Sequence, residues 1–336
     1  MNSSDAIRRR ELDPADVPAG IVGLGLMGTS IAACLLAAGH RVAGVEADAS
    51  KRRIAARRVL ALLGESRKEG LLRGIPSEII KRLHVGGDYI ALKGADIVIE
   101  CVTESVEAKR EVLHRVEEVV SPKTLIGSNT SAIPITDLQQ GALRPERIMG
   151  IHWAEPAHAT RFMEIICGKG TRPAYAKLAF TLARRWGKEP SLLRRDVRGF
   201  LTNRCMYAMM REAFHLVESG YATIAEVDRS LRNDLGYWIT FAGPFRIMDL
   251  TGIPAYEAVM RDLLPDLSCA KEVPPLLRKL VQSGAQGVSN CKGFYHYTPA
   301  QARRWERRFR KFTYEIRALA GKYPEDGADR PRRASQ

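Results

Sequence analysis

Three glycines near the N-terminus have the spacing of a loop that holds phosphates. Gly23, Gly25 and Gly28 form a G-x-G-x-x-G pattern between a short apolar run and a strongly helical segment. In such a loop the first glycine permits a tight turn, the second lets the backbone approach a pyrophosphate, and the third allows close helix–strand packing. The following helix offers free N–H groups and its positive dipole end to the phosphates. The pattern predicts a dinucleotide site contacted by Gly23, Gly25, Leu26, Met27 and Gly28.

An acidic residue at the end of the next predicted strand supports this interpretation. Three glycines can also mark a plain strand-to-helix turn, but here the strand predicted at residues 41–45 leads into Glu46, which is placed to bind a ribose diol. Glu46 and Asp48 would repel the 2′-phosphate of NADP, and no arginine directly follows the strand. Basic residues 51–53 lie a helical turn further on. We therefore expect NAD as the cofactor.

Polar side chains lie at the ends of later predicted strands. An enzyme that moves a hydride from an alcohol to nicotinamide needs a base for the hydroxyl proton, a group that orients the base, and polar groups for the new carbonyl. Ser131 and His152 follow or end two successive strands, and Glu164 lies in the strand after them. Asn203 begins the first helix of the next segment. These four are the candidates, with His158 in the loop after His152 as a spare base.

A regular alternation of strands and helices positions these residues. After the strands before Gly23 and before Glu46, strands are expected at residues 84–87, 95–102, 124–128, 147–152, 162–167 and 189–193, and helices at 106–120 and 172–186. A helical excursion over residues 50–83 is expected to break at Gly64, Gly70 and the turn at 74–76. The alternation is typical of an α/β domain with a doubly wound parallel sheet over residues 18–195.

The character of the chain changes after Gly199, where only helical patterns remain. Helices are expected at residues 203–218, 223–231, 243–250, 254–264 and 274–283, followed by a long helix with one apolar stripe of Trp305, Phe309, Phe312, Ile316 and Leu319. The stripe must pack on its own domain or on a second subunit. We expect a smaller all-α domain over residues 196–321, a polar N-terminal arm over residues 1–17 and a disordered tail over residues 322–336.

The charge of +14 is concentrated in two segments. Residues 51–82 carry ten Lys and Arg against three acidic residues, and residues 299–336 carry eleven against five. Charges that alternate with apolar residues at helical spacing indicate solvated helix faces, and the other interpretation is attraction of a small polyanionic ligand. No nucleic-acid motif accompanies the charge, so no nucleic-acid partner is expected.

The remaining composition narrows the class of protein. The six cysteines form no C-x-x-C pair and lie mostly in apolar segments, which indicates small buried side chains and neither a disulfide framework nor a metal site. No apolar run has the length of a membrane span, and residues 1–16 do not form a signal peptide. We expect a cytoplasmic protein with no membrane partner.

Several motifs occur in the order and spacing of the 3-hydroxyacyl-CoA dehydrogenase family, and the chain resembles that family from about residue 18 to residue 297. They are Gly23–Gly28, residues 99–104 (IECVTE), residues 128–131 (SNTS), His152 with Glu164 twelve residues on, residues 196–204 (DVRGFLTNR), residues 243–245 (GPF) and residues 292–295 (KGFY). The resemblance implies a Rossmann domain, a helical dimerisation domain that makes a homodimer, and NAD-dependent oxidation of a 3-hydroxy group.

The resemblance also implies roles for individual residues. His152 would be the general base, and Glu164 would fix its tautomer and support the imidazolium. Ser131 and Asn203 would hold the substrate oxygens. Glu46, Glu104 and Lys109 would line the NAD site. Imidazole titrates near neutrality and a carboxylate partner raises its basicity, so the chemistry is consistent with these roles.

Departures from the family pattern leave the substrate open. Glu155 replaces a usual Asn after the histidine, Arg198 replaces a Pro, and Ser289 begins a replacement for Lys-Thr-Gly. The stretch of residues 236–244 is longer than in fatty-acid-type enzymes and resembles the lambda-crystallin/gulonate and carnitine dehydrogenase branches, although Trp238 stands where those branches tend to place an Arg. With the later residues 297–301, it also resembles a pyridine-carboxylate dehydrogenase of vitamin B6 breakdown.

Three functions therefore remain as hypotheses. The first is a 3-hydroxyacyl-CoA dehydrogenase that oxidises the C3 hydroxyl of a thioester, with the basic segment 51–82 receiving the CoA. The second is a dehydrogenase of a small free 3-hydroxy acid or a hydroxymethyl-aromatic carboxylic acid, favoured by the stretch 236–244. The third is a non-catalytic NAD-binding protein of the crystallin kind, against which the set of His152, Glu164 and Asn203 argues.

Overall fold

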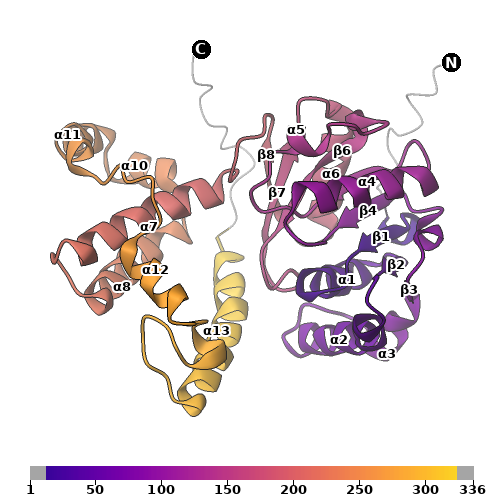
Figure 1. Ribbon diagram of the computed structural model, residues 1–336, viewed down its shortest axis with the longest axis horizontal. Helices are drawn as coiled ribbons and strands as arrows, with labels where there is room; N and C mark the ends of the chain where they lie inside the picture. The colour runs from indigo at the N-terminus through magenta and orange to yellow at the C-terminus, as the bar shows by residue number, and fades with distance from the viewer. Residues whose placement is uncertain (1–12, 324–336) are drawn as a thin grey trace. The chain divides into compact units, whose positions relative to one another are not determined.

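The computed structural model describes residues 13–323, which form two compact units divided between Arg204 and Cys205 (Figure 1). Each unit is described by itself. Residues 324–336 of the expected tail and residues 1–12 of the expected N-terminal arm lie outside the described residues. The described end of that arm includes a short 3-10 turn, Pro14–Asp16, followed by the buried Val17.

An eight-stranded sheet forms the centre of the first unit, in the order β3-β2-β1-β4-β5-β6-β7-β8. Its strands are β1 Ala19–Val22, β2 Val42–Val45, β3 Leu83–Gly86, β4 Ile97–Glu100, β5 Leu125–Ser128, β6 Ile148–Trp153, β7 Phe162–Cys167 and β8 Glu189–Leu193. Strands β1 to β6 are all parallel. The chain order reverses at β1 and β4, which is the point where doubly wound sheets bind ligands.

Helices cover both faces of this sheet (Figure 1). They are α1 Leu26–Ala38, α2 Ala49–Lys68, α3 Pro76–Ile79, α4 Val106–Val119, α5 Ile135–Leu138 and α6 Pro173–Arg185. Successive residues of β4 point to opposite faces: Ile97 and Ile99 join the core under α1, α2 and α6, whereas Val98 joins the core under α4 and α5. Burial on both faces explains why the strands are continuous apolar runs.

The expectation of an entirely parallel sheet needs one correction. β7 runs antiparallel to β6, and β8 then runs parallel to β7. Only residues 154–161 connect β6 to β7, and they contain no helix. A crossover between parallel strands needs a dozen or more residues, so this short connection requires an antiparallel pair.

Gly64 does not break the helix that contains it. α2 continues through Gly64 to Lys68, whereas Gly70 has a positive φ of 75° and lies just after the helix end. Ala55, Val59 and Leu63 of α2 are fully buried in the core. Their burial outweighs the roughly 1 kcal/mol by which an interior glycine disfavours a helix.

The second unit is entirely helical in its described part. Its helices are α7 Thr202–Glu218, which begins in the first unit, α8 Ile224–Asn233, α9 Leu235–Ile239, α10 Pro244–Thr251, α11 Ile253–Leu263, α12 Pro275–Gln282 and α13 Pro299–Ala320. The short α9 was not expected from the sequence. Few described side chains of this unit are buried in the single chain; they are Val227, Ala242, Ala302, Thr313 and Tyr314.

The expected burial of the α13 stripe and of the cysteines is only partly found within the single chain. The apolar stripe of α13 is largely exposed, with Phe309 at 64% and Phe312 at 56% of full exposure, while the helix buries Ala302, Thr313 and Tyr314. Among the cysteines, Cys205 and Cys269 are exposed, and all six are free thiols. No helix of residues 13–323 has the length and apolarity to cross a bilayer.

Candidate functional site

The glycine-rich loop joins β1 to α1 and leaves room at one position only. A Cβ on Gly28 would lie 1.8 Å from the Gly23 carbonyl oxygen, and one on Gly23, whose φ is +91°, would lie 2.8 Å from the Cys101 carbonyl oxygen. A Cβ on Gly25, the N-cap of α1, would meet nothing within 4 Å. Gly23 and Gly28 are therefore tightly packed, whereas the space next to Gly25 is open. The first N–H groups of α1 are presented to this open space.

Glu46 ties the end of β2 to this loop. Its carboxylate accepts hydrogen bonds from the Leu24 N–H at 2.8 Å and from the Asp48 N–H at 3.0 Å, and the residue is buried. Leu26 is 63% exposed at the start of α1, while Met27 is half-buried against the core. A phosphate-binding helix start and an acidic group at the end of the second strand fit the pyrophosphate and ribose of a dinucleotide.

His152 and Glu164 are direct neighbours across the β6/β7 pair. The His152 Nδ1 and the Glu164 Oε2 are 2.8 Å apart, and both residues are buried. Because a carboxylate only accepts, Nδ1 carries the hydrogen, which leaves Nε2 of the neutral ring as a proton acceptor. Nε2 has no hydrogen-bond partner within residues 13–323. The spacing of twelve residues follows from the hairpin register.

The turn after β8 completes the surroundings of this pair. Gly199 and Phe200 have positive φ values of 81° and 53°. This conformation is uncommon for a phenylalanine. The turn brings the N–H groups of Leu201 and Thr202 to the Glu164 Oε1, at 3.1 and 2.9 Å. The fully buried Phe200 ring lies 5.7 Å from the His152 ring.

These hydrogen bonds keep Glu164 ionised. Burial raises the pKa of Glu164, but the hydrogen bonds from His152, Thr202 and Leu201 outweigh it, so the pKa lies below the usual range of a glutamate. The carboxylate can therefore compensate a positive charge on the imidazole. The arrangement suits a general base whose orientation and tautomer are both fixed.

Ser131 and Asn203 lie together beside these strands. The Asn203 Nδ2 donates to the Ser131 carbonyl oxygen at 2.8 Å. Ser131 is exposed, and its hydroxyl has no hydrogen-bond partner within the described residues. Asn129, in the same loop, accepts a hydrogen bond from the Trp153 N–H at 2.9 Å, next to His152. The loop after β5 is thus fixed to the strand that carries the histidine.

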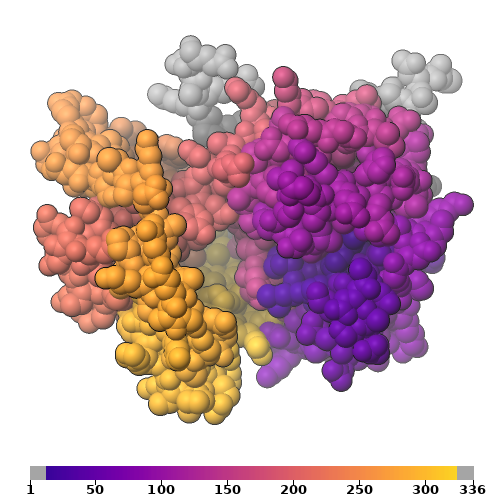
Figure 2. Space-filling model, in the orientation of Figure 1, coloured from indigo at the N-terminus to yellow at the C-terminus, as the bar shows by residue number. Residues whose placement is uncertain are grey.

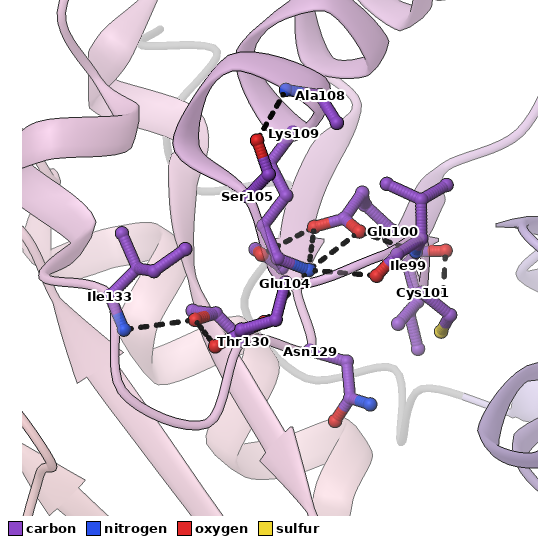
Figure 3. A network of polar contacts seen from close by, with 12 residues as sticks. Ile99, Glu100, Cys101, Glu104, Ser105, Ala108, Lys109, Asn129, Thr130 and Ile133 are labelled. Carbon is purple, nitrogen blue, oxygen red and sulfur yellow. Dashed lines mark hydrogen bonds and ion pairs between the residues drawn. The ribbon is translucent and has the colours of Figure 1, made fainter.

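A buried ionic network supports the loops after β4 and β5 (Figure 3). The Lys109 ammonium lies 2.9 and 3.1 Å from the two carboxylate oxygens of Glu100 and 3.3 Å from the Glu104 Oε2. Ser128 and the Val102 N–H also donate to Glu100, at 2.5 and 2.6 Å. Glu100 and Lys109 are 0% and 1% exposed. Because water does not solvate these charges, each is stabilised by the other and by these hydrogen bonds.

Glu104 transmits this support to the loop after β5. Its Oε1 accepts hydrogen bonds from the Thr130 hydroxyl at 2.6 Å and from the N–H groups of Ser131 and Ala132 at 2.8 and 3.2 Å. Burial raises the pKa of Glu104, but the Thr130 hydrogen bond and the Lys109 charge lower it below its usual range. The Glu104 side chain is 43% exposed, against 1% for Lys109. Solvent therefore reaches the Glu104 side chain, whereas Lys109 is buried.

Comparison with known proteins identifies the family. The profile of the 3-hydroxyacyl-CoA dehydrogenase NAD-binding domain matches residues 18–197, and that of the 3-hydroxyacyl-CoA dehydrogenase C-terminal domain matches residues 199–297. The chain belongs to the 3-hydroxyacyl-CoA dehydrogenase family. It is an NAD-dependent dehydrogenase acting on CH–OH groups.

Two relatives of this dehydrogenase represent two kinds of substrate. A 5-formyl-3-hydroxy-2-methylpyridine 4-carboxylate 5-dehydrogenase of Mesorhizobium japonicum is 33% identical over 304 residues, which cover 90% of this chain and 98% of the relative. A probable 3-hydroxybutyryl-CoA dehydrogenase of Deinococcus radiodurans is 30% identical over 281 residues, 83% of this chain and 99% of the relative.

Solved structures show the same two groups. The structure of a 5-formyl-3-hydroxy-2-methylpyridine 4-carboxylic acid 5-dehydrogenase, titled an NAD+-dependent dismutase, superposes with a TM-score of 0.84 at 29% identity and covers 91% of this dehydrogenase and 99% of its own chain. The (S)-3-hydroxybutyryl-CoA dehydrogenase of Ralstonia eutropha superposes with a TM-score of 0.69 at 28% identity, over 84% and 99%.

The sequence alone did not single out several residues of this site. Glu100, Thr130 and Phe200 were not candidates, although Glu100 is a charged residue inside a strand expected to be buried on both faces. A buried charge needs a partner, and Lys109 in the next helix was the available cation. Glu155 lies in the loop after β6; burial raises its pKa, and its carboxyl group accepts no hydrogen bond from a described residue. Residues 13–323 contain no cluster of metal ligands.

The Glu100–Lys109 pair should behave as one unit in stability measurements. We expect Lys109→Met to lower the free energy of unfolding by about 3–5 kcal/mol, because it leaves the Glu100 carboxylate buried without its cation. Glu100→Gln should destabilise for the same reason. The double variant Glu100→Gln/Lys109→Met removes both charges and should be less destabilised than the sum of the single variants.

A double-mutant cycle of urea unfolding measures this coupling. The exposed pair Lys81 and Glu78, whose charged atoms are 2.7 Å apart, provides the matched control, since solvent screens it and its coupling should stay below about 1 kcal/mol. Additive effects of Glu100→Gln and Lys109→Met would show that the two charges are independent.

Proposed function

We propose that this dehydrogenase oxidises a hydroxyl or hydrated formyl group on a small aromatic carboxylic acid. The observation that supports this proposal most is the similarity to the pyridine-carboxylate dehydrogenase, which covers nearly the full length of both chains at a TM-score of 0.84. The longer stretch of residues 236–244 supports it as well. The 3-hydroxybutyryl-CoA dehydrogenases cover less of the chain and superpose with lower TM-scores.

In this proposal His152 is the general base. Its Nε2 takes the proton of the substrate hydroxyl while Glu164 holds the opposite ring nitrogen and compensates the positive charge that develops. Bound NAD supplies the hydride acceptor. Gly23, Gly25, Leu26, Met27 and Gly28 would hold its pyrophosphate.

Further residues would hold the cofactor and the substrate. Glu46 and Glu104 would line the rest of the cofactor site, and Lys109 would act through Glu104. Ser131 and Asn203 would hold the substrate oxygens, since both lie in polar segments fixed to the strand of His152.

A 3-hydroxyacyl-CoA thioester is the second candidate substrate. Arg57 and Arg58 lie exposed on α2, in the basic segment where the family resemblance places the CoA. Cationic side chains attract the phosphates of CoA. The family membership itself favours this candidate, so a direct comparison of substrates is needed.

Measurement of NADH formation with a set of substrates tests the choice. We expect turnover of 5-formyl-3-hydroxy-2-methylpyridine 4-carboxylate or a related hydroxymethyl-pyridine acid, with a kcat/KM at least about 100-fold above that for 3-hydroxybutyryl-CoA, because a pocket built for one substrate loses polar contacts to another. Free 3-hydroxybutyrate controls for the carboxylate alone. Turnover of the thioester alone would instead establish the acyl-CoA function.

Replacement of the base tests the mechanism. We expect His152→Ala to lower kcat by about 10²- to 10⁴-fold, the usual contribution of a positioned base, while the Kd for NADH measured by fluorescence stays within about twofold. His158→Ala is the matched control, since the His158 Nδ1 lies 2.9 Å from the Ser30 hydroxyl and the residue is buried in the loop after β6. Retained turnover in His152→Ala would exclude His152 as the base.

The pH dependence of the native protein provides a second check. The lowered pKa of Glu164 keeps this carboxylate ionised as the pH falls. Glu164 should therefore not titrate within the acid limb of the rate profile, and a single protonation should describe that limb. In Glu164→Gln the rate should drop and this limb should move, since the imidazolium loses its counter-charge.

The second unit supports assembly as a homodimer through residues 196–321. Its described part exposes large apolar side chains on two helices, with Phe245 of α10 at 79% and Val259 of α11 at 57%. Exposed apolar area of this kind indicates a surface for another chain. The resemblance to a family with a helical dimerisation domain points to a second copy.

Sedimentation velocity measures the association directly. We expect a dimer at micromolar concentration, and Phe245→Asp should shift the protein toward monomer because it places a charge on the apolar surface. Arg303→Asp changes an exposed site of α13 in the same unit and should leave the dimer intact. A native monomer would contradict the assembly.

A further inference from the structure

A groove of about 860 Å³ lies between α8 and α13 of the second unit, and its lining contains none of the residues assigned above to the dehydrogenase reaction. Figure 2 shows both helices at the surface of this unit, α8 in salmon and α13 in yellow. The lining residues come from α8, from the segment before α13, and from the first turns of α13: Ala225, Asp228, Arg229, Arg232, Tyr295, His296, Tyr297, Gln301, Arg304, Trp305 and Arg308.

The groove has a large excess of positive charge. Four arginines line it, two from α8 and two from α13, against a single carboxylate, Asp228. None of the four forms an ion pair with a carboxylate of residues 13–323. Guanidinium groups held near one another repel, and the repulsion is relieved by a bound anion with oxygens that accept bidentate hydrogen bonds.

The one carboxylate of the lining is already engaged. The Tyr295 hydroxyl donates to the Asp228 Oδ2 at 2.6 Å. This hydrogen bond raises the pKa of Tyr295 to about 12, so the phenol keeps its proton at neutral pH. Asp228 forms this hydrogen bond and no ion pair with Arg229 or Arg304.

Aromatic rings lie among these cations. Trp305 is 51% exposed, and the Arg308 guanidinium carbon lies 5.9 Å from the centre of its ring. Tyr297 and His296 line the same groove. Exposed indole rings beside guanidinium groups stack flat ligand rings, and each stacked ring contributes about 1–3 kcal/mol in nucleic-acid-binding proteins.

We propose that this groove binds a small aromatic polyanion, a flat ring that carries two or more phosphate or carboxylate groups. Arg229 and Arg304 would hold the anionic groups, and Trp305 would stack on the ring. The volume lies within the range of about 300–1,000 Å³ typical of small-molecule sites. Nucleotides and aromatic polycarboxylates share this chemistry, and the experiment distinguishes them.

Isothermal titration calorimetry on the full chain, with NAD present at saturation to fill the cofactor site, tests the proposal. ATP and benzene-1,3,5-tricarboxylate are the two probes, and we expect one of them to bind with a submillimolar Kd. Tripolyphosphate, which lacks a ring, and adenosine, which lacks charge, should each bind at least about tenfold more weakly than ATP if the nucleotide is the favoured class. Cyclohexane-1,3,5-tricarboxylate is the corresponding control for the other probe.

Variants locate the binding. Arg229→Gln/Arg304→Gln should raise the Kd at least about tenfold, since two charge-assisted hydrogen bonds are lost. Trp305→Leu should remove the difference between the probe and its ring-free counterpart. Arg303→Gln/Arg307→Gln makes the same change of charge at exposed positions of α13 outside the groove and should leave the Kd within about twofold.

Three results would overturn the proposal. They are the failure of both aromatic probes to bind, binding that Arg229→Gln/Arg304→Gln leaves unchanged, and binding of the ring-free anions as tight as that of the aromatic ones. The last result would indicate a site for anions without a stacking ring. None of these outcomes depends on the substrate of the dehydrogenase.

Discussion

The first unit depends on the need to satisfy a buried carboxylate, that of Glu164. An ionised carboxylate out of water requires several donors, and here there are three: the His152 ring in β6 and the N–H groups of Leu201 and Thr202 after β8. The antiparallel β6/β7 pair and the turn with two positive φ values at Gly199 and Phe200 bring these donors to the carboxylate. The same contacts fix the histidine.

The second buried carboxylate, Glu100, has a parallel role at the neighbouring strands. Glu100 lies at the end of β4 and binds the ammonium group of Lys109 in α4 and the hydroxyl group of Ser128 at the end of β5. Through Glu104 the ionic network reaches the loop that contains Ser131. The Glu100 centre therefore fixes the loops after β4 and β5, and the Glu164 centre fixes His152 near the carboxyl end of β6. Rigidity of this kind is what orientation of a hydride transfer requires.

Much of this arrangement could be predicted from the sequence. Strands buried on both faces are continuous apolar runs, so β5 and β7 were placed to within one residue, while β4 was expected two residues too long at each end. Strand direction could not be predicted, because a period of two residues carries no information on polarity; the short connection 154–161 was the available signal. The continuation of α2 through Gly64 depends on tertiary burial that local propensity does not contain.

The sequence also could not reveal which cation pairs with which anion. Lys109 was expected at the cofactor, whereas the structure buries its ammonium against Glu100, because pairing depends on distances across the sheet. Likewise, the apolar stripe on α13 has a clear helical period, yet the period does not tell whether the same chain covers it. Residues 13–323 leave it largely exposed.

The register of the β6/β7 hairpin determines which residues of this part of the fold can vary and which cannot. The pairing of His152 with Glu164 depends on the side-chain alternation within β6 and β7, and a slip of one residue in either strand would turn one partner to the opposite face. Residues 154–161 between the strands take no part in this register, although Ala157, His158 and Ala159 are buried. A change of an exposed side chain in this loop, such as Glu155, can therefore alter the neighbourhood of the histidine while its partner stays in place. Variation at such a position would change the surroundings of the proposed general base without altering its pairing with Glu164.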